Sequence, residues 1–117
     1  MKNTIKLNRE FRRCYKQGMC AAVGSIVLYA FKNNRHKDFN RYGLTVSKTI
    51  GNAVLRNRAK RLMRVAYRNT EEFQYKGFDF IIVARSRING KTSDIVTEDF
   101  VGALKKLGIW KNEESIT

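Results

Sequence analysis

Apolar and polar residues recur along this chain with two different periods, and near the N-terminus the period is that of a helix. We predict a first helix over Leu7–Gln17, with Asn8 as its candidate cap and Gly18 as its end. Its apolar face would be formed by residues at helical spacing, namely Leu7, Phe11, Cys14 and Tyr15.

Three apolar runs predict β-strands. Gly24–Lys32 is rich in β-branched and aromatic residues, and Tyr42–Ser47 alternates between apolar and polar residues. The polar segment Asn33–Asn40 between them predicts a loop, so we expect these two strands to pair as a hairpin. Phe78–Ala84 is a nearly continuous apolar run, which is typical of a strand buried on both faces.

Two longer helices complete the prediction. One covers Ala53–Asn69 behind the candidate cap Asn52, and the other runs from a cap at Thr92 or Ser93 to Lys106. The buried stripe of the former would be Leu55, Ala59, Leu62, Met63 and Ala66. The inner face of the latter would be Val96, Phe100, Ala103, Leu104 and Leu107.

The predicted order is α-β-β-α-β-α, a mixed α/β layout with helices packed on a small sheet. The 117 residues fit one domain over 1–117, with a core from about 7 to 107 and a frayed tail over 111–117. If the strands on either side of the middle helix are parallel, their crossover is right-handed by the general rule.

The charge of the chain indicates what kind of partner such a domain binds. It has 24 Lys and Arg against 10 Asp and Glu, a net charge of +14. Residues 1–70 carry 17 of the basic residues and 2 of the acidic ones, whereas residues 71–117 carry 7 and 8. A surplus of this size usually serves a polyanionic partner, so we expect a nucleic acid to bind the first 70 residues.

The predicted middle helix carries the densest part of this charge. At 100° per residue a basic row lies opposite its apolar stripe, with two residues beside the row and Arg58 at the edge of the stripe. The row is Arg56, Lys60, Arg64 and Arg68, flanked by Asn57 and Arg61. A helix that merely faces water normally intersperses Glu, yet no acidic residue occurs between Arg41 and Arg68. The pattern therefore favours phosphate binding, to which arginine is well suited.

Aromatic residues offer a second candidate site. Phe11 and Tyr15, together with Tyr29, could form a groove wall on which unpaired bases stack, or they could equally be core residues. Lys48 follows the second predicted strand, where it could guide a backbone phosphate or simply face solvent.

Residues that could carry catalysis are few. His36 lies in the polar loop with no obvious Cys or Asp partner, so a nucleophilic triad has little support. The candidate carboxylates form a thin ligand set for a metal-dependent nuclease, and they are Asp79, Asp94, Glu98 and Asp99.

Cys14 and Cys20 are too few for a zinc site, and we expect them to be reduced, as in a cytoplasmic protein. No apolar run reaches the length of a membrane span, and no N-terminal apolar segment predicts a secretory signal. We therefore expect no membrane partner.

Two runs of residues carry a resemblance to a known family. Gly43–Lys48 (GLTVSK) and Ile50–Arg64 (IGNAVLRNRAKRLMR) together resemble the signature of the bacterial ribonuclease P protein, whose distinctive element is the Arg-Asn-Arg helix. The likeness extends to Phe11 and Tyr15, to Val27–Tyr29 (VLY) and to Ile81–Arg85 (IIVAR). It thus covers most of the chain, from about residue 7 to residue 107.

This resemblance implies a fold and an activity. The fold would be the two-layer α+β arrangement of the second domain of ribosomal protein S5, in which the βαβ crossover is left-handed, against the general rule. The chain would be the protein subunit of ribonuclease P, which removes the 5′ leader of precursor tRNA. The RNA subunit would perform the hydrolysis with bound Mg²⁺, while the protein would raise the affinity for substrate and metal.

The resemblance also assigns roles to residues. The Arg-Asn-Arg helix would lie against the catalytic RNA through Arg56, Asn57, Arg58, Lys60, Arg61 and Arg64, with Arg68 continuing the row. A cleft between the first helix and the sheet would hold the single-stranded leader through Phe11, Tyr15, Val27, Tyr29 and Lys48. We expect no catalytic residue and no metal ligand on this chain, and no DNA partner.

Two positions depart from the family pattern. Thr49 stands where many relatives have a second basic residue, which weakens the positive charge of the cleft there, and Tyr15 stands where relatives often have Phe, which should still stack. A ribosomal or other structural RNA-binding protein is an alternative that the charge and fold fit as well. A protein-only nuclease is a further alternative, which the missing His, Asp and Glu constellation disfavours.

Overall fold

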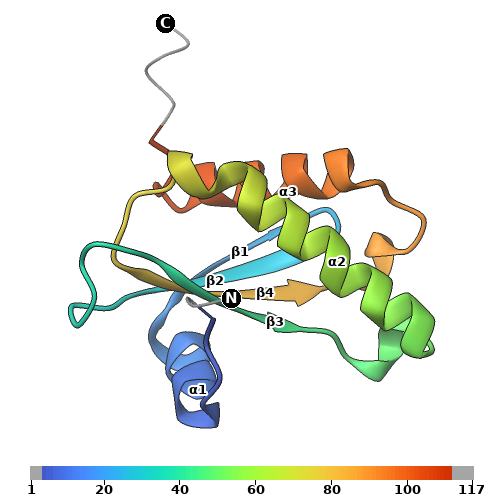
Figure 1. Ribbon diagram of the computed structural model, residues 1–117, viewed down its shortest axis with the longest axis horizontal. Helices are drawn as coiled ribbons and strands as arrows, with labels where there is room; N and C mark the ends of the chain where they lie inside the picture. Colours follow the sequence, from blue (N-terminus) through green and yellow to red (C-terminus); the bar gives the residue numbers. More distant parts are fainter. Residues whose placement is uncertain (1–3, 112–117) are drawn as a thin grey trace, which may run out of the picture.

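The computed structural model of this protein describes residues 4–111, which form three α-helices and one four-stranded sheet (Figure 1). In chain order the main elements are α1 (Asn8–Gln17), β1 (Met19–Val23), β2 (Ile26–Lys32), β3 (Arg41–Thr45), α2 (Ala53–Thr70), β4 (Phe78–Ala84) and α3 (Ser93–Lys106). Three short 3₁₀ turns connect them, namely η1 (Lys48–Ile50), η2 (Glu71–Phe73) and η3 (Ser86–Ile88).

The sheet has the strand order β1-β2-β4-β3. β1 and β2 are antiparallel, as are β2 and β4, whereas β3 and β4 are parallel and are joined through α2. The βαβ unit expected from the sequence is therefore present, and the left hand that the family resemblance implies for it stays a prediction.

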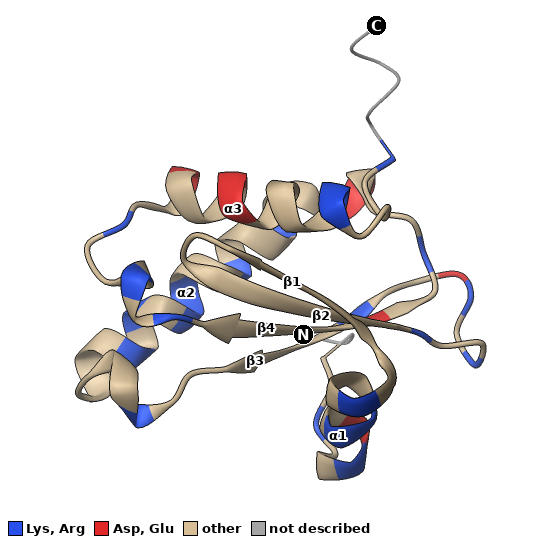
Figure 2. Cartoon of the chain, turned by 180° about the vertical axis from the view of Figure 1, so that it is seen from behind, with Lys and Arg blue, Asp and Glu red and all other residues tan. Residues whose placement is uncertain are grey.

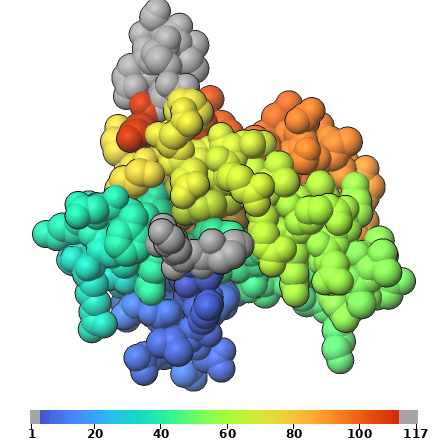
Figure 3. All heavy atoms as spheres, in the orientation of Figure 1, coloured from blue at the N-terminus to red at the C-terminus, as the bar shows by residue number. Residues whose placement is uncertain are grey.

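Helices cover the two faces of the sheet unequally (Figure 1). α2 and α3 lie on one face, over a large core that includes Leu28, Phe80 and Phe100. α1 lies on the other face, over a small cluster in which Cys14 and Ile81 are fully buried. In the space-filling view α2 forms a ridge across the front of the molecule and α1 protrudes below it (Figure 3).

Strand β4 lies at the centre of this architecture. Six of its seven residues are buried, because one face meets α2 and α3 while the other meets α1. The strand that the sequence predicts at Phe78–Ala84 is confirmed with the same bounds. The caps predicted for α2 and α3 are confirmed too, since Asn52 accepts a hydrogen bond from the Leu55 amide and Thr92 accepts one from the Ile95 amide.

The hairpin predicted between Gly24–Lys32 and Tyr42–Ser47 is wrong, because the corresponding strands β2 and β3 do not pair. β4 pairs with both β2 and β3 and lies between them. The intervening loop holds the strands apart, because Asn33 and His36 both bind the side chain of Asp79 in β4, and Asn40 accepts a hydrogen bond from the Phe78 amide. Contacts with a strand far along the sequence therefore decide this pairing.

Three smaller expectations are also corrected. The first is strand β1, which the sequence analysis missed: Ala and Cys give Met19–Val23 a weak strand pattern. The second concerns α1, since Asn8 is its first residue, Leu7 occupies the cap position without a side-chain cap, and Leu7 is 47 % exposed. The third is Leu55, which is 37 % exposed because the first turn of α2 projects past the core and packs on Gly51. The frayed tail expected over 111–117 lies outside the described residues apart from Lys111.

Candidate nucleic-acid interface

Helix α2 presents a basic face on the side away from the core. Its buried side is formed by Ala59, Leu62, Met63, Ala66, Tyr67 and Thr70. Of the predicted row and its neighbours, Asn57, Arg61 and Arg68 are exposed, while Arg56, Arg58, Lys60 and Arg64 are half-buried. Figure 2 shows the basic residues along α2, whereas acidic residues occur on α3. The predicted separation of an apolar and a basic face is confirmed for this helix, apart from Leu55.

The positive charge of α2 is not neutralised within the described part of the chain. All ion pairs found over residues 4–111 involve Glu10 or Asp79, and none of them includes a residue of α2. Two arginines donate to main-chain oxygens instead: Arg56 Nη1 binds the Gly51 carbonyl at 2.9 Å and Arg58 Nη2 binds the Lys91 carbonyl. These bonds fix the directions of the two guanidinium groups and leave their charge available to an anion.

On the opposite side of the sheet, α1 covers one end of the face and leaves the other end open. Because cross-strand partners point to the same side, the pairings Ala22–Val27, Val27–Val83 and Thr45–Val83 form a row on this face. Ala22 is exposed, and Val27, Thr45 and Val83 are half-buried. This open row lies at the end of β3 from which the chain leads to η1 and the start of α2 (Figure 1).

Two tyrosines stand beside the open row. The rings of Tyr15 on α1 and Tyr29 on β2 meet edge to face, with centroids 4.8 Å apart at an interplanar angle of 87°. The Tyr15 hydroxyl also lies 2.8 Å from Thr45 Oγ1, which fixes the ring against β3. Burial, followed by the neighbouring Cys20 and Tyr15, raises the pKa of Tyr29. The edge-to-face arrangement of the two rings suits contact with an unpaired base. An uncharged phenol also does not repel the phosphate group attached to that base.

The other residues predicted for this cleft are placed differently. Phe11 is half-buried and packs so closely on Gly43 that a Cβ atom there would lie 2.6 Å from Phe11 Cζ. Phe11 and Tyr29 both pack on the small core cluster, so the core and groove interpretations left open by the sequence both apply to them. Lys48 is exposed in η1, beyond the end of β3, where it extends the open row toward α2.

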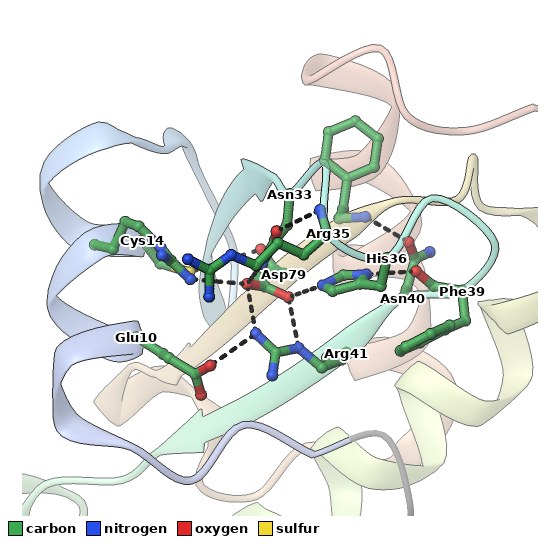
Figure 4. A network of polar contacts seen from close by, with 11 residues as sticks. Glu10, Cys14, Asn33, Arg35, His36, Phe39, Asn40, Arg41 and Asp79 are labelled. Atoms are coloured by element: carbon green, nitrogen blue, oxygen red, sulfur yellow. Dashed lines mark hydrogen bonds and ion pairs between the residues drawn. The ribbon is translucent and has the colours of Figure 1, made fainter.

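A buried carboxylate, which the sequence analysis did not recognise, ties α1 to the sheet (Figure 4). Asp79 in β4 is fully buried and accepts hydrogen bonds from Arg41 Nε and Nη2, both at 2.9 Å. Arg41 in turn forms an ion pair with Glu10 of α1 at 3.1 Å, and Arg13 of α1 lies 3.9 Å from Asp79. Ion pairs as well as packing therefore fix α1 against its half of the sheet face.

His36 has a partner after all, contrary to the expectation that it has none. Its Nε2 lies 2.7 Å from Asp79 Oδ1, and its Nδ1 lies 2.9 Å from the carbonyl oxygen of Phe39. Burial alone would raise the pKa of Asp79, but hydrogen bonds from Arg41 and Asn33 and the charge of Arg41 hold it below its usual value. This His–Asp pair is buried and connects the loop to β4.

Within residues 4–111, no group of three or more His, Cys, Asp or Glu side chains lies close enough to hold a metal ion. Asp99 is engaged in the fold, where its carboxylate accepts hydrogen bonds from the amide and hydroxyl of Ser25. Cys14 and Cys20 are free, as predicted, and burial, with the charge of Asp79 next, raises the pKa of the Cys14 thiol to about 11. A search of the described helices finds none with the length and apolar character that a membrane crossing requires.

Comparison with known proteins identifies the family. The sequence model of the family described as Ribonuclease P matches residues 1–108. The chain belongs to this family. Among its curated relatives, the ribonuclease P protein component of Clostridium acetobutylicum is 40% identical over 116 residues, which cover 98% of either chain. That of Clostridium beijerinckii is 36% identical over 94% of this chain and 92% of its own.

Solved structures of ribonuclease P proteins have the same fold. The Staphylococcus aureus protein is 32% identical and superposes with a TM-score of 0.82, covering 92% of this chain and 97% of its own. The Thermotoga maritima protein is 27% identical with a TM-score of 0.78, over 88% and 96% of the two chains. The predicted family and fold class are therefore confirmed over the alternative of a ribosomal protein. The chain is thus a member of the ribonuclease P family, whose bacterial relatives are named as ribonuclease P protein components.

Proposed function

We propose that this chain binds the catalytic RNA subunit of ribonuclease P through the basic face of α2, and the 5′ leader of precursor tRNA across the open row. The proposal rests above all on the unneutralised charge of α2, because a helix that only faces water would carry compensating acids. Family membership supplies the identity of the RNA. The continuity between the open row, Lys48 and the start of α2 supports simultaneous contact with both RNAs.

In this proposal the protein promotes leader removal without catalysing it. In this proposal the Mg²⁺ used in the hydrolysis is held by the RNA. The chain's own side chains would contribute positioning, by neutralising phosphates along α2 and by stacking unpaired leader bases on Tyr15 and Tyr29. We propose the cytoplasm as the location, where both RNAs occur.

Reconstitution tests this function directly. Purified full-length chain is incubated with precursor tRNA in the presence and absence of a bacterial ribonuclease P RNA, at a Mg²⁺ concentration where the RNA alone is slow. Cleavage at the mature 5′ end that needs both components supports the proposal. Cleavage by the chain alone would instead establish a protein-only nuclease, and no stimulation of the RNA would reject the processing role.

The incubation of the chain without ribonuclease P RNA also bears on an activity described for a relative. A Staphylococcus aureus relative of known structure, 31% identical over 93% of this chain with a TM-score of 0.84, is described as a mutant with defective mRNA degradation activity. Incubation of the chain with an mRNA, without ribonuclease P RNA, would show whether this chain degrades RNA by itself.

Removal of the Tyr29 ring should affect precursor and mature tRNA differently. Tyr29→Ala removes a stacking surface, so we expect the reconstituted enzyme to bind leader-bearing precursor about tenfold more weakly, while mature tRNA binds as before. Filter binding with both RNAs measures the ratio. Tyr75→Ala is the matched control, because Tyr75 is an exposed tyrosine near η2, away from the open row. Equal losses for precursor and mature tRNA would reject the leader assignment.

A further inference from the structure

A pocket of about 340 Å³ lies at the outer edge of strand β3, between α2 and the segment that precedes α1. Its lining includes Lys6 from that segment, Tyr42 and Leu44 from β3, and Lys60 and Arg64 from α2, and Phe11 of α1 closes one side. The resemblance assigns Lys60 and Arg64 to the catalytic RNA and Phe11 to the leader, but it describes no pocket between them. This pocket opens at the edge of the sheet and is separate from the open row on its face.

The polar lining of the pocket selects an anion. Lys60 and Arg64 are four residues apart on α2, so they lie on one side of the helix, and both are half-buried. Neither side chain forms an ion pair within residues 4–111, and no Asp or Glu lines the pocket. Two half-buried cations without a counter-ion indicate that a negatively charged group is the missing partner.

The apolar lining is suited to an aromatic base. The Tyr42 ring is stacked on Tyr67 of α2, with centroids 4.1 Å apart at 26°, so its position is fixed by the core. The Tyr42 carbonyl accepts a hydrogen bond from the Ile5 amide, which shows that the main-chain groups of Tyr42 point outward from the sheet edge. By the two-residue repeat of a strand, the main-chain N–H and C=O of Leu44 point the same way, toward the pocket. They provide one donor and one acceptor for the edge of a base.

The volume of the pocket restricts the size of the ligand. About 340 Å³ is at the small end of ligand sites, which is room for one nucleotide but not for a base pair. We propose that the pocket holds a single unpaired nucleotide of the RNA partner, with its phosphate between Lys60 and Arg64 and its base against Tyr42 and Leu44. The proposal rests on the proposed function for the source of the nucleotide. The proposal assigns two functions to the basic face of α2: Lys60 and Arg64 line the pocket, whereas Arg61 and Arg68 are exposed and face outward.

The pocket can be tested without any RNA. Adenosine 5′-monophosphate is titrated into the isolated full chain at low salt and followed by amide NMR, with adenosine and inorganic phosphate as separate probes. We expect the nucleotide to shift the Tyr42 and Leu44 amides and to bind more tightly than either fragment. Inorganic phosphate binding as tightly as the nucleotide would overturn the base site, and an absence of shifts in the pocket would overturn the proposal.

Variants distinguish the pocket from general electrostatic attraction. Lys60→Gln with Arg64→Gln should weaken nucleotide binding at least about tenfold. Lys105→Gln with Lys106→Gln removes the same charge from exposed positions on α3 and should weaken it less than about twofold. Lys60→Arg with Arg64→Lys keeps both charges and should retain most of the binding, which controls for folding. Equal losses in the two Gln pairs would refute the pocket.

The affinity of the variants for the catalytic RNA tests whether that RNA supplies the nucleotide. If the nucleotide belongs to that RNA, the Lys60 and Arg64 Gln pair should weaken assembly more than about tenfold, and the Lys105 and Lys106 pair should not. Normal assembly combined with lost nucleotide binding would overturn the RNA source in favour of a free nucleotide. Failure of the processing assay leaves the titration of the isolated chain unaffected, so the two proposals fail separately.

Discussion

Arg61→Ala together with Arg68→Ala should lower the affinity of the chain for ribonuclease P RNA about 100-fold. Both side chains are exposed on α2, and neither has an ion-pair partner among the described residues, so their charge is free to contact phosphate. A hydrogen bond to a charged group contributes about 1.5 kcal/mol or more, which for two residues gives roughly 3 kcal/mol. The slope of log affinity against log salt should also become shallower by about 2, since two phosphate contacts release fewer counterions.

Filter binding over a series of salt concentrations measures both quantities. The matched control is Lys105→Ala with Lys106→Ala, which changes net charge equally on α3 and should leave the salt slope almost unchanged. Urea denaturation should show that the α2 variant loses less than about 1 kcal/mol of stability, because exposed substitutions cost little. An unchanged salt slope for the α2 variant would show that the helix faces water and would remove the main support for the proposed function.

Asp79→Ala should destabilise the fold by about 3–5 kcal/mol. The substitution removes the anion that Arg41 and His36 share inside the sheet face and leaves their hydrogen-bonding groups without a buried partner. It also removes the contact that connects β4 with Arg13 of α1. Urea denaturation measures the loss, and Asp94→Ala is the control, because Asp94 is exposed in the first turn of α3 and should cost less than about 1 kcal/mol. A loss below about 1 kcal/mol for Asp79→Ala would mean that packing alone holds α1.

The same carboxylate predicts the direction of the pH dependence. The pKa of Asp79 is lower in the folded chain than its usual value, so the folded state favours the ionised form. Its contribution to stability is therefore complete above the unfolded pKa, about 3.9, and is lost as the pH falls through the lower folded value. Asp79→Ala should abolish this part of the acid sensitivity, as denaturation curves between about pH 2 and 5 would show.

The local pattern of residues was sufficient to predict those elements whose position depends on residues close together in the sequence. The continuous apolar run of β4, the cap at Asn52 and the basic row of α2 were all readable from the sequence, because each depends on neighbours within one or two turns. Strand β1 was missed since an edge strand of small residues lacks such a signal. The family likeness then supplied the particular fold, which the pattern alone left as a mixed α/β layout.

Features that depend on distant contacts could not be predicted in this way. The partner of β2 is decided by a strand about fifty residues later, and the role of Asp79 emerges only when Asn33, His36 and Arg41 converge on it. In the sequence, Asp79 stands alone within an apolar run and resembled only a weak candidate for a metal ligand. Its position opposite Arg41 in the register of β3 and β4 would have been the useful clue, but that register depends on the fold.

The central position of β4 has a consequence for synthesis. Until Phe78–Ala84 has left the ribosome, a nascent chain has the β1–β2 hairpin but nothing to join it to β3, and α2 has no completed surface on which to bury Met63 and Tyr67. Isolated helices and two-stranded hairpins are marginal in water. The segment that holds all of the surplus positive charge is thus translated well before it can acquire its native shape. A fragment ending at residue 70 would be an aggregation-prone polycation without a defined RNA-binding surface.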